Sequence, residues 1–434
     1  MVGGLRRAWS ISEDHQTSGP RSLAERIGPE LQAPTAFPKG GYYGRLDIYT
    51  SVIVPITEGI ERGHEEAIVW NGARVRAWVP DLLASQNFEV GIPTARRTEQ
   101  AIAAMRAGGA ASARFEPLAL LLLRAEGVAS SYIEGLRTPL VDVAAAEVGD
   151  TSNPIAGWVA DNLAAVRQAL DGAGRSLAVE DIHEWHRRLM GPTNRLPEEM
   201  VGAFRTAQSW IGGTSPRDAS FVPPPPGRVD GLMADLVAFA NAEEVDPVTQ
   251  AAVAHAQFET IHPYGDGNGR IGRILIGWIL AHRIGITVPP PVSVFIARDP
   301  GGYLAGLTRF RLGELDPWVH WLAAELRYSS EAAQGLLERT EHLLVEWVGR
   351  IDDLRADATA RRVLSVLVEH PVVSSDLVAA RVEVSERSAR GALTVLADRG
   401  ILEPYDSTPA GPGRPRRFWV ASDLITLVTN WSPL

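Results

Sequence analysis

The stretch FETIHPYGDGNGRIGR, from Phe258 to Arg273, gathers most of the residue types that are used in phosphate chemistry. A helical pattern ends near His262, where Pro263 stops it, and a second helical pattern begins near Arg270. YGDGNG is therefore predicted to be a loop that leads into a helix N-terminus. Glycine has no Cβ to cover the backbone N–H groups, and the helix dipole favours negative charge. The stretch predicts a polyphosphate-binding site.

Individual side chains around this loop suit separate tasks in phosphate transfer. Asp266 offers the hard oxygen ligand that Mg²⁺ prefers. Arg270 and Arg273 are three positions apart, so they share one face of a helix and can reach further phosphates. His262 is the group at the rim whose usual pKa suits a general base near neutral pH. The backbone is expected to bind phosphate at Gly265, Gly267 and Gly269.

The segment HPYGDGNGRIGR resembles the HPFxDGNGR signature of Fic-domain proteins, with Tyr264 where phenylalanine is usual. The resemblance continues through GAFRTAQSWIGG, FVPPPP and HAQFETIHP, and so covers about residues 112–325. It implies a helical Fic core that transfers AMP from ATP to a Ser, Thr or Tyr hydroxyl of a target protein. Tyr264 adds only a hydroxyl group, which a protein core accommodates if that group finds a partner.

The resemblance also implies a role for each residue of the signature. His262 would deprotonate the target hydroxyl, Asp266 would hold Mg²⁺, and Arg270 would help to hold the leaving pyrophosphate. ATP and Mg²⁺ are the expected cofactors. Catalysis would depend on His262, Asn268 and Arg270, and nucleotide binding would involve Gly265, Gly267, Asn268, Gly269, Arg270 and Arg273.

A second motif lies upstream, in SSYIEGLRT. Ser130, Glu134 and Gly135 fit the (S/T)xxxE(G/N) inhibitory motif that accompanies many Fic domains. The resemblance pairs Glu134 with Arg273, so that the carboxylate would compete with the γ-phosphate of ATP. Ser131 and Glu134 also fit a capping box at a helix start, although a glycine directly after Glu134 is more typical of a helix end.

Most of the chain outside these motifs is predicted to be α-helical. Apolar residues recur three and four positions apart in residues 115–135, 156–170, 179–190, 229–243, 246–262 and 270–285. AIVWNGARVRAWV alternates in the manner of a short strand or hairpin. The stretch RTAQSWIGGTSPRDASFVPPPP predicts a second hairpin, from 209–211 and 220–222, that four prolines end. This hairpin resembles the flap on which Fic enzymes align the target backbone, and an ordinary surface hairpin is the alternative.

The domain organisation follows from these patterns. We expect a mobile tail at 1–40, an N-terminal Fic-associated region at 41–111, the catalytic core with the inhibitory helix at 112–325, a connecting helix at 326–356 and a terminal unit at 357–434.

The terminal unit resembles a winged helix-turn-helix. Ser375 and Ser385 are candidate N-caps, Gly400 is a candidate C-cap, and TPAGPGRPRR is a candidate wing. Nine arginines balance nine aspartates and glutamates here, so DNA binding and protein docking remain alternatives. The arginines that could contact phosphate are Arg387, Arg390, Arg414, Arg416 and Arg417.

Composition limits the remaining choices. The chain of 434 residues has no cysteine, which excludes disulfides, thiolate nucleophiles and cysteine-ligated zinc. A formal net charge of -10 argues against coating of nucleic acid by charge alone. No signal sequence or membrane span is visible, so a cytoplasmic protein without membrane contact is expected. The histidines of HEWH, from His183 to His186, lack zincin spacing and are interpreted as packing or surface residues.

We therefore predict a protein adenylyltransferase that depends on ATP and Mg²⁺ and is autoinhibited by Glu134. Its target would dock along the hairpin flap. The alternatives within this family are the reverse reaction, which removes AMP, and transfer of another nucleotide or of phosphocholine. The alternative of a different class is a DNA-binding regulator that senses a nucleotide. Self-modification and a homodimer are left open.

Overall fold

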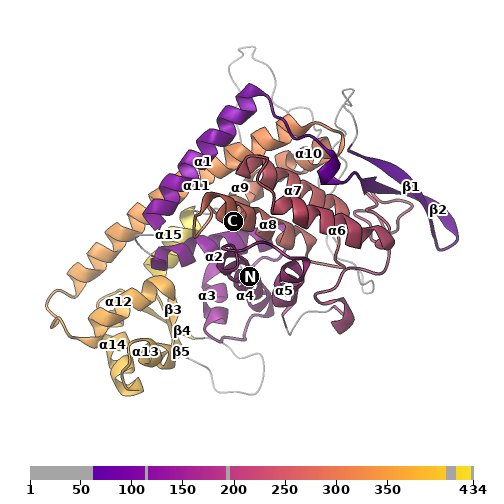
Figure 1. Ribbon diagram of the computed structural model, residues 1–434. Helices are drawn as coiled ribbons and strands as arrows, with labels where there is room; N and C mark the ends of the chain where they lie inside the picture. Colours follow the sequence, from indigo (N-terminus) through magenta and orange to yellow (C-terminus); the bar gives the residue numbers. More distant parts are fainter. Residues whose placement is uncertain (1–61, 113–115, 192–195, 407–416, 432–434) are drawn as a thin grey trace, which may run out of the picture. The chain divides into compact units, whose positions relative to one another are not determined.

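The computed structural model describes residues 62–112, 116–191, 196–406 and 417–431, all within one unit of the chain. The fold is mainly α-helical, as predicted (Figure 1). No helix in these ranges is long and apolar enough to cross a membrane. The helices up to residue 350 are α1 (Ile92–Ser112), α2 (Glu116–Ile133), α3 (Leu140–Glu147), α4 (Pro154–Asp171), α5 (Val179–Met190), α6 (Pro226–Ala240), α7 (Pro247–Ile261), α8 (Asn268–Ile284), α9 (Val292–Arg298), α10 (Pro300–Arg311) and α11 (Leu315–Arg350).

Helix α7 is the central element, and it is buried along almost its whole length. Its start is fixed by Asp246, whose side chain accepts hydrogen bonds from the N–H groups of Val248 and Thr249, with Pro247 in the first turn. Small residues along α7 allow several neighbours to approach it closely, and it contacts α1, α6, α8, α10 and α11. The core therefore holds the end of α7, and the loop that follows it, in a fixed position.

Two helices depart from the sequence-based prediction. Helix α1 lies in a region where the sequence showed only a mixed pattern, because its apolar and polar residues do not segregate to opposite faces. Helix α11 begins at Leu315 and so runs through the expected boundary between core and connecting helix at 325–326. Helices α1 and α11 pack against each other along their length (Figure 1).

The hairpin expected in AIVWNGARVRAWV is present as β1 (Gly63–Trp70) and β2 (Ala73–Pro80). Its two-residue turn uses Asn71 with φ 45° and Gly72 with φ 75°, the left-handed pair that a tight hairpin requires.

The second predicted hairpin is reduced to one antiparallel bridge between Ile211 and Phe221. The reason is local, because the Asp218 carboxylate accepts hydrogen bonds from the N–H groups of Thr214 and Ser215 and closes a turn in place of a strand ladder. We refer to residues 206–224 as the flap loop.

The C-terminal elements form a small three-stranded sheet with helices beside it. The strand order is β3–β5–β4, and both pairings are antiparallel. Ser374, one residue before the predicted Ser375, is the N-cap of the second helix, whereas Ser385 caps the third helix as predicted. Gly400 follows that helix with φ 65°. The elements are α12 (Thr359–Glu369), β3 (Val372–Val373), α13 (Ser375–Arg381), α14 (Glu386–Asp398), β4 (Glu403–Asp406), β5 (Arg417–Val420) and α15 (Ser422–Trp431).

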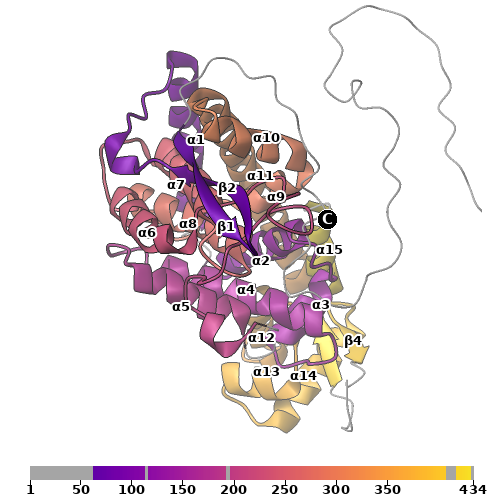
Figure 2. The ribbon, with the colours of Figure 1, turned by 90° about the vertical axis from the view of Figure 1, so that its right-hand side faces the viewer.

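These C-terminal elements contact helices α2 and α3, which precede the loop between α7 and α8 in the chain. Helix α12 packs on α2, while β3 and α15 pack on α3 (Figure 1, Figure 2). Arg124 of α2 donates hydrogen bonds to the carboxylate of Glu147 and to the backbone carbonyl of Glu369, at the end of α12. Most of the candidate wing, with Arg414 and Arg416, lies outside the described residues, and the winged-helix assignment stays a prediction.

Candidate active site

The loop between α7 and α8 has the shape that the sequence predicted. Helix α7 ends at Ile261, and His262 follows in the left-handed conformation with φ 51°. Helix α8 starts at Asn268, after Gly267 with φ 78°. The Asn268 side chain bonds both to the N–H of Tyr264, at 2.8 Å, and to its carbonyl oxygen, at 2.9 Å. The side chain of Asn268 thus shapes the loop, and its backbone N–H belongs to the first turn of α8, where N–H groups lack partners within the helix and an anion is favoured.

Tyr264 fills a core position, as expected for the usual phenylalanine, and its hydroxyl has a partner. The ring is fully buried and stacks on the imidazole of His186 at a centroid distance of 4.0 Å. The hydroxyl lies 3.0 Å from Nδ1 of His183. The predicted packing role of the HEWH histidines is therefore confirmed.

His186 also holds the loop itself. Its Nδ1 accepts a hydrogen bond from the N–H of Gly202, so Nε2 carries the proton and donates to the carbonyl oxygen of Asp266 at 3.1 Å. Burial lowers the pKa of His186 to about 3, which keeps the ring neutral.

His262 lies in the loop between α7 and α8, and one of its ring nitrogens is buried. Its Nδ1 has no hydrogen-bond partner in the described chain. Burial, assisted by the positive charge of Arg205, lowers the pKa of His262 to about 3. The imidazole is therefore neutral at physiological pH, so one ring nitrogen keeps a free lone pair. A pKa this low also makes His262 a weaker base than the unperturbed histidine that the sequence analysis expected.

Arg205 positions the backbone around His262, and the sequence analysis assigned it no role. The guanidinium donates to the carbonyl oxygens of His262 at 2.8 Å, Pro224 at 2.6 Å and Ala207 at 3.2 Å. The Arg205 side chain is buried, so these backbone carbonyl oxygens take the place of the water molecules that would otherwise bind the guanidinium. Arg205 thereby ties both ends of the flap loop to the backbone of His262. In the sequence, Arg205 could be noticed only as the arginine of GAFRTAQSWIGG, one of the segments that resemble Fic-domain proteins.

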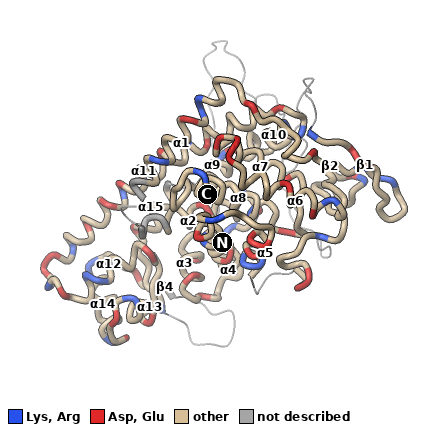
Figure 3. Tube along the Cα trace, in the orientation of Figure 1, with Lys and Arg blue, Asp and Glu red and all other residues tan. Residues whose placement is uncertain are grey.

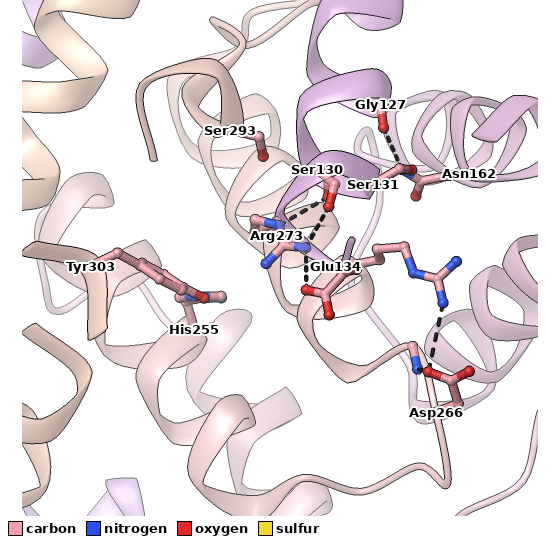
Figure 4. A network of polar contacts seen from close by, with 12 residues as sticks. Gly127, Ser130, Ser131, Glu134, Asn162, His255, Asp266, Arg273, Ser293 and Tyr303 are labelled. Atoms are coloured by element: carbon pink, nitrogen blue, oxygen red, sulfur yellow. Dashed lines mark hydrogen bonds and ion pairs between the residues drawn. The ribbon is translucent and has the colours of Figure 1, made fainter. Parts of the chain in front are cut away.

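A cavity of about 240 Å³ connects the two motifs that the sequence singled out. Arg273 projects into it from α8 and meets the end of α2 (Figure 4). Its guanidinium donates to Oγ and the carbonyl oxygen of Ser130, both at 2.9 Å, and to Oε1 of Glu134 at 2.7 Å. Residues that line the cavity include Glu134, Glu259, His262, Gly269, Arg273 and Tyr303.

The ion pair between Glu134 and Arg273 is largely shielded from water, with side chains 15% and 1% exposed. Burial alone would lower the pKa of Arg273, but the carboxylate of Glu134 outweighs it and the pKa is raised. A Cβ at Gly269 would come within 2.1 Å of Glu134 Oε1. The carboxylate therefore rests against the first turn of α8, where the sequence predicted an anion.

Gly135 ends helix α2 in the left-handed conformation, with φ 80°. The N–H groups of Gly135 and Leu136 return to the carbonyl oxygens of Tyr132 and Ser131, the arrangement of a helix C-terminus. The alternative of a capping box at a helix start is therefore wrong. Oγ of Ser131 instead accepts a hydrogen bond from the side chain of Asn162.

Asp266 and Arg270 lie at the outer side of the loop. Their side chains are 3.7 Å apart, and the Asp266 carboxylate is about half exposed. Nε of Arg270 is buried without a hydrogen-bond partner in the part of the chain that the structure describes. Within the described ranges no group of three or more His, Asp or Glu residues could enclose a metal ion. A single exposed carboxylate fits Mg²⁺ when phosphate oxygens and water complete the coordination.

Glu259 is a buried carboxyl group in the same cavity, and the sequence analysis assigned it no role. Its Oε1 has no hydrogen-bond partner among the described residues. Burial raises the pKa of Glu259 to about 8, although Arg273 opposes this. A Cβ at position 272 would lie 2.7 Å from Glu259 Oε1. The absence of a side chain at Gly272 therefore makes room for the Glu259 carboxyl group. The sequence did contain a sign of this buried carboxyl group, because Glu259 lies one turn before His262 in a helix that is otherwise rich in alanine.

Comparison with known proteins agrees with this geometry. The model of the Fic/DOC family matches residues 176–280, the segment that contains Arg205, the flap loop and the loop before α8. The chain thus carries a domain of the Fic/DOC family. The segment around Glu134 and the C-terminal elements lie outside the matched residues.

Several relatives share about a third of this chain. Protein adenylyltransferase fic-1 of Caenorhabditis briggsae is 34% identical over 165 residues, which are 37% of this chain and 30% of that protein. Protein adenylyltransferase Fic of Culex quinquefasciatus is 34% identical over 150 residues, 34% of this chain and 27% of that protein. The chain therefore matches less than a third of the length of these relatives.

Solved structures of Fic proteins are also similar. A Fic family protein from Desulfovibrio desulfuricans G20 has a TM-score of 0.49 and 21% identity, with 77% of this chain and 98% of that chain covered. Fic-1 from C. elegans has a TM-score of 0.46 and 22% identity, with 57% of this chain and 74% of that chain covered.

Proposed function

We propose that this protein transfers AMP from ATP to a hydroxyl group of a target protein. The observation that carries the proposal is that one cavity is lined by a neutral His262, by Gly269 at a helix N-terminus and by the guanidinium of Arg273. A base and two features that favour phosphate thus face the same space. Similarity to proteins named adenylyltransferases supports AMP as the transferred group.

Each residue of the site has a separate role in the proposed reaction. His262 takes the proton of the target hydroxyl, whose oxygen then forms a bond to the α-phosphorus of ATP. The bond between that phosphorus and the bridging oxygen breaks, and pyrophosphate leaves with the electron pair. Backbone N–H groups at the start of α8 and the guanidinium of Arg270 hold the phosphates. Asp266 is suited to hold Mg²⁺, whose charge, when it is bound, offsets that of the phosphates.

We further propose that Glu134 inhibits this reaction in cis. Its carboxylate contacts Arg273 and rests against Gly269, so it competes with a phosphate for one guanidinium and for one helix terminus. ATP that binds beside a paired Glu134 would have its phosphates displaced, and the α-phosphorus would be misaligned for attack.

The test is transfer of label from ATP labelled at the α-phosphate, first to the protein itself and then to proteins of a cell lysate. His262→Ala should abolish labelling and leave ATP binding largely intact, because a base for the incoming hydroxyl contributes little to phosphate affinity. His342→Ala is the matched control, since His342 is exposed on α11. Unchanged labelling by His262→Ala would remove this histidine from the mechanism.

Two further measurements separate the alternatives. Asp266→Ala should raise the Mg²⁺ concentration needed for half-maximal transfer, and an unchanged requirement would contradict its role as ligand. The mass of the adduct distinguishes AMP from another nucleotide or phosphocholine. Loss of AMP from a labelled target, without transfer under any condition, would instead support the reverse reaction.

A further inference from the structure

Strand β2 has one edge that is only partly paired. In a hairpin closed by a two-residue turn, the pair next to the turn is hydrogen-bonded and the bonding alternates along the strands. The pairing of Trp70 with Ala73 therefore directs the backbone N–H and C=O groups of Arg74, Arg76 and Trp78 away from β1. The N–H of Trp78 donates to the carbonyl oxygen of Val222 in the flap loop, at 2.8 Å.

The outward backbone groups of Arg74 and Arg76 have no such partner within the described chain. Beyond the bond between Trp78 and Val222, toward the hairpin tip, a groove of about 450 Å³ lies between β2 and the flap loop. Its walls include Arg74 and Arg76 on one side, and Arg217 and Ser220 on the other. An unpaired strand edge that faces a groove is the arrangement in which an extended peptide adds as a further strand.

The groove carries positive charge on a protein whose formal net charge is -10. Arg74, Arg76 and Arg217 line it, and Glu65 is the carboxylate among the lining residues. Glu65 is paired with Arg76, which leaves the exposed residues Arg74 and Arg217 without a carboxylate partner in the described chain. Blue segments mark Lys and Arg positions on the hairpin of β1 and β2 in Figure 3. An acidic peptide complements this surface.

The groove is also connected to the proposed catalytic base. The flap loop forms one wall, and Arg205 ties the ends of that loop to the carbonyl oxygen of His262. A segment bound against the loop is therefore attached to an element with a fixed position relative to the histidine.

We propose that the groove between β2 and the flap loop binds an acidic, extended segment of the target protein as an added strand on β2. The proposal rests on the proposed transfer function, because the occupant is taken to be the target. Backbone hydrogen bonds to Arg74 and Arg76 supply the affinity, and Arg74 and Arg217 select for carboxylates.

Proline substitution on the two edges of the hairpin tests the added strand. Arg76→Pro removes an N–H that faces the groove, whereas Arg76→Ala removes the same charge and keeps the N–H. Ala67→Pro is the matched control, because Ala67 pairs with Arg76 and its N–H points away from β2. The probe is a short fluorescein-labelled peptide of alternating glutamate and threonine, and the readout is anisotropy with the full chain.

We expect Arg76→Pro to weaken peptide binding about threefold to tenfold more than Arg76→Ala, the effect of one hydrogen bond. Ala67→Pro should bind as the wild type does. Arg74→Glu with Arg217→Glu should abolish binding of the glutamate peptide and permit binding of a lysine–threonine peptide. Equal binding by the two Arg76 variants, or tighter binding of a labelled DNA oligonucleotide than of the peptide, would overturn the proposal.

Binding and transfer can fail separately. His262→Ala should retain peptide binding while it loses transfer of labelled AMP. Peptide binding without transfer in both the wild type and Glu134→Gly would refute the proposed function and leave the groove assignment standing. Transfer to lysate proteins that is unchanged in Arg74→Glu with Arg217→Glu would show that the groove does not select the target.

Discussion

Replacement of Glu134 by glycine is expected to increase AMP transfer and to decrease stability at the same time. The Oε1 of Glu134 accepts a hydrogen bond of 2.7 Å from a guanidinium that is almost fully buried. A hydrogen bond between charged groups contributes about 1.5 to 3 kcal/mol. If a phosphate must displace this contact, its removal raises the competent population by roughly 10-fold to 150-fold.

The two effects have opposite signs, which makes the prediction specific. Breaking one partner of a buried ion pair destabilises a fold by about 3 to 5 kcal/mol. The two hydrogen bonds from Arg273 to Ser130 remain and should reduce that cost. A purely structural glutamate would therefore lower activity and thermal stability together, whereas an inhibitory one lowers stability and raises activity.

The assay compares initial rates of auto-labelling at one protein concentration, with thermal unfolding of the same samples. Glu134→Gln is the matched control, since it keeps the shape and one acceptor oxygen but loses the charge, and its rate should lie between the other two. Glu134→Gly combined with Arg273→Ala should lose the gain, because the guanidinium that the phosphate needs is then absent. Equal rates in wild type and Glu134→Gly would refute the inhibitory role.

Three further predictions concern buried polar groups. The raised pKa of Glu259, about 8 against 4.5, means that the folded chain keeps a proton which the unfolded chain releases. Stability should therefore fall between about pH 4.5 and pH 8, by at most about 5 kcal/mol, and urea unfolding of Glu259→Gln should lack this loss. Tyr264→Phe removes only the contact with His183, so it should cost less than about 1.5 kcal/mol in the same assay and retain transfer; abolished transfer would contradict a packing role. Arg124→Ala leaves the Glu147 carboxylate without its buried partner and should lower the free energy of unfolding by about 3 kcal/mol or more, as measured by thermal unfolding. A decrease of less than about 1 kcal/mol would show that the fold does not require this ion pair.

Much of the loop between α7 and α8 could be predicted from the sequence because its determinants are local. Pro263 cannot continue a helix, Gly267 adopts a left-handed conformation that other residues avoid, and Asp246 caps the helix that ends at the loop. Gly135 ended α2 for the same reason. Each of these effects acts over a few residues of chain.

Predictions that depended on neighbouring elements were less accurate. The flap stretch has strand-like residues on both sides of a turn, but Asp218 closes the turn with its side chain and only one bridge forms. Helix α1 shows little amphipathic pattern, and its extensive packing against α11 supplies the stability that its own sequence does not indicate.

The sequence by itself determined the helix ends, the loop between α7 and α8 and the order of the motifs, because backbone sterics and capping operate between near neighbours. The pairing of Glu134 with Arg273, which are 139 positions apart, entered the sequence analysis through family resemblance. The tertiary structure decided which polar groups are buried and therefore no longer solvated by water. It buried Glu259 without a partner, made His262 neutral beside Arg205, and opened the edge of β2 toward the flap loop. Desolvation and charge–charge contact depend on distance through space, which only the packing of the helices fixes.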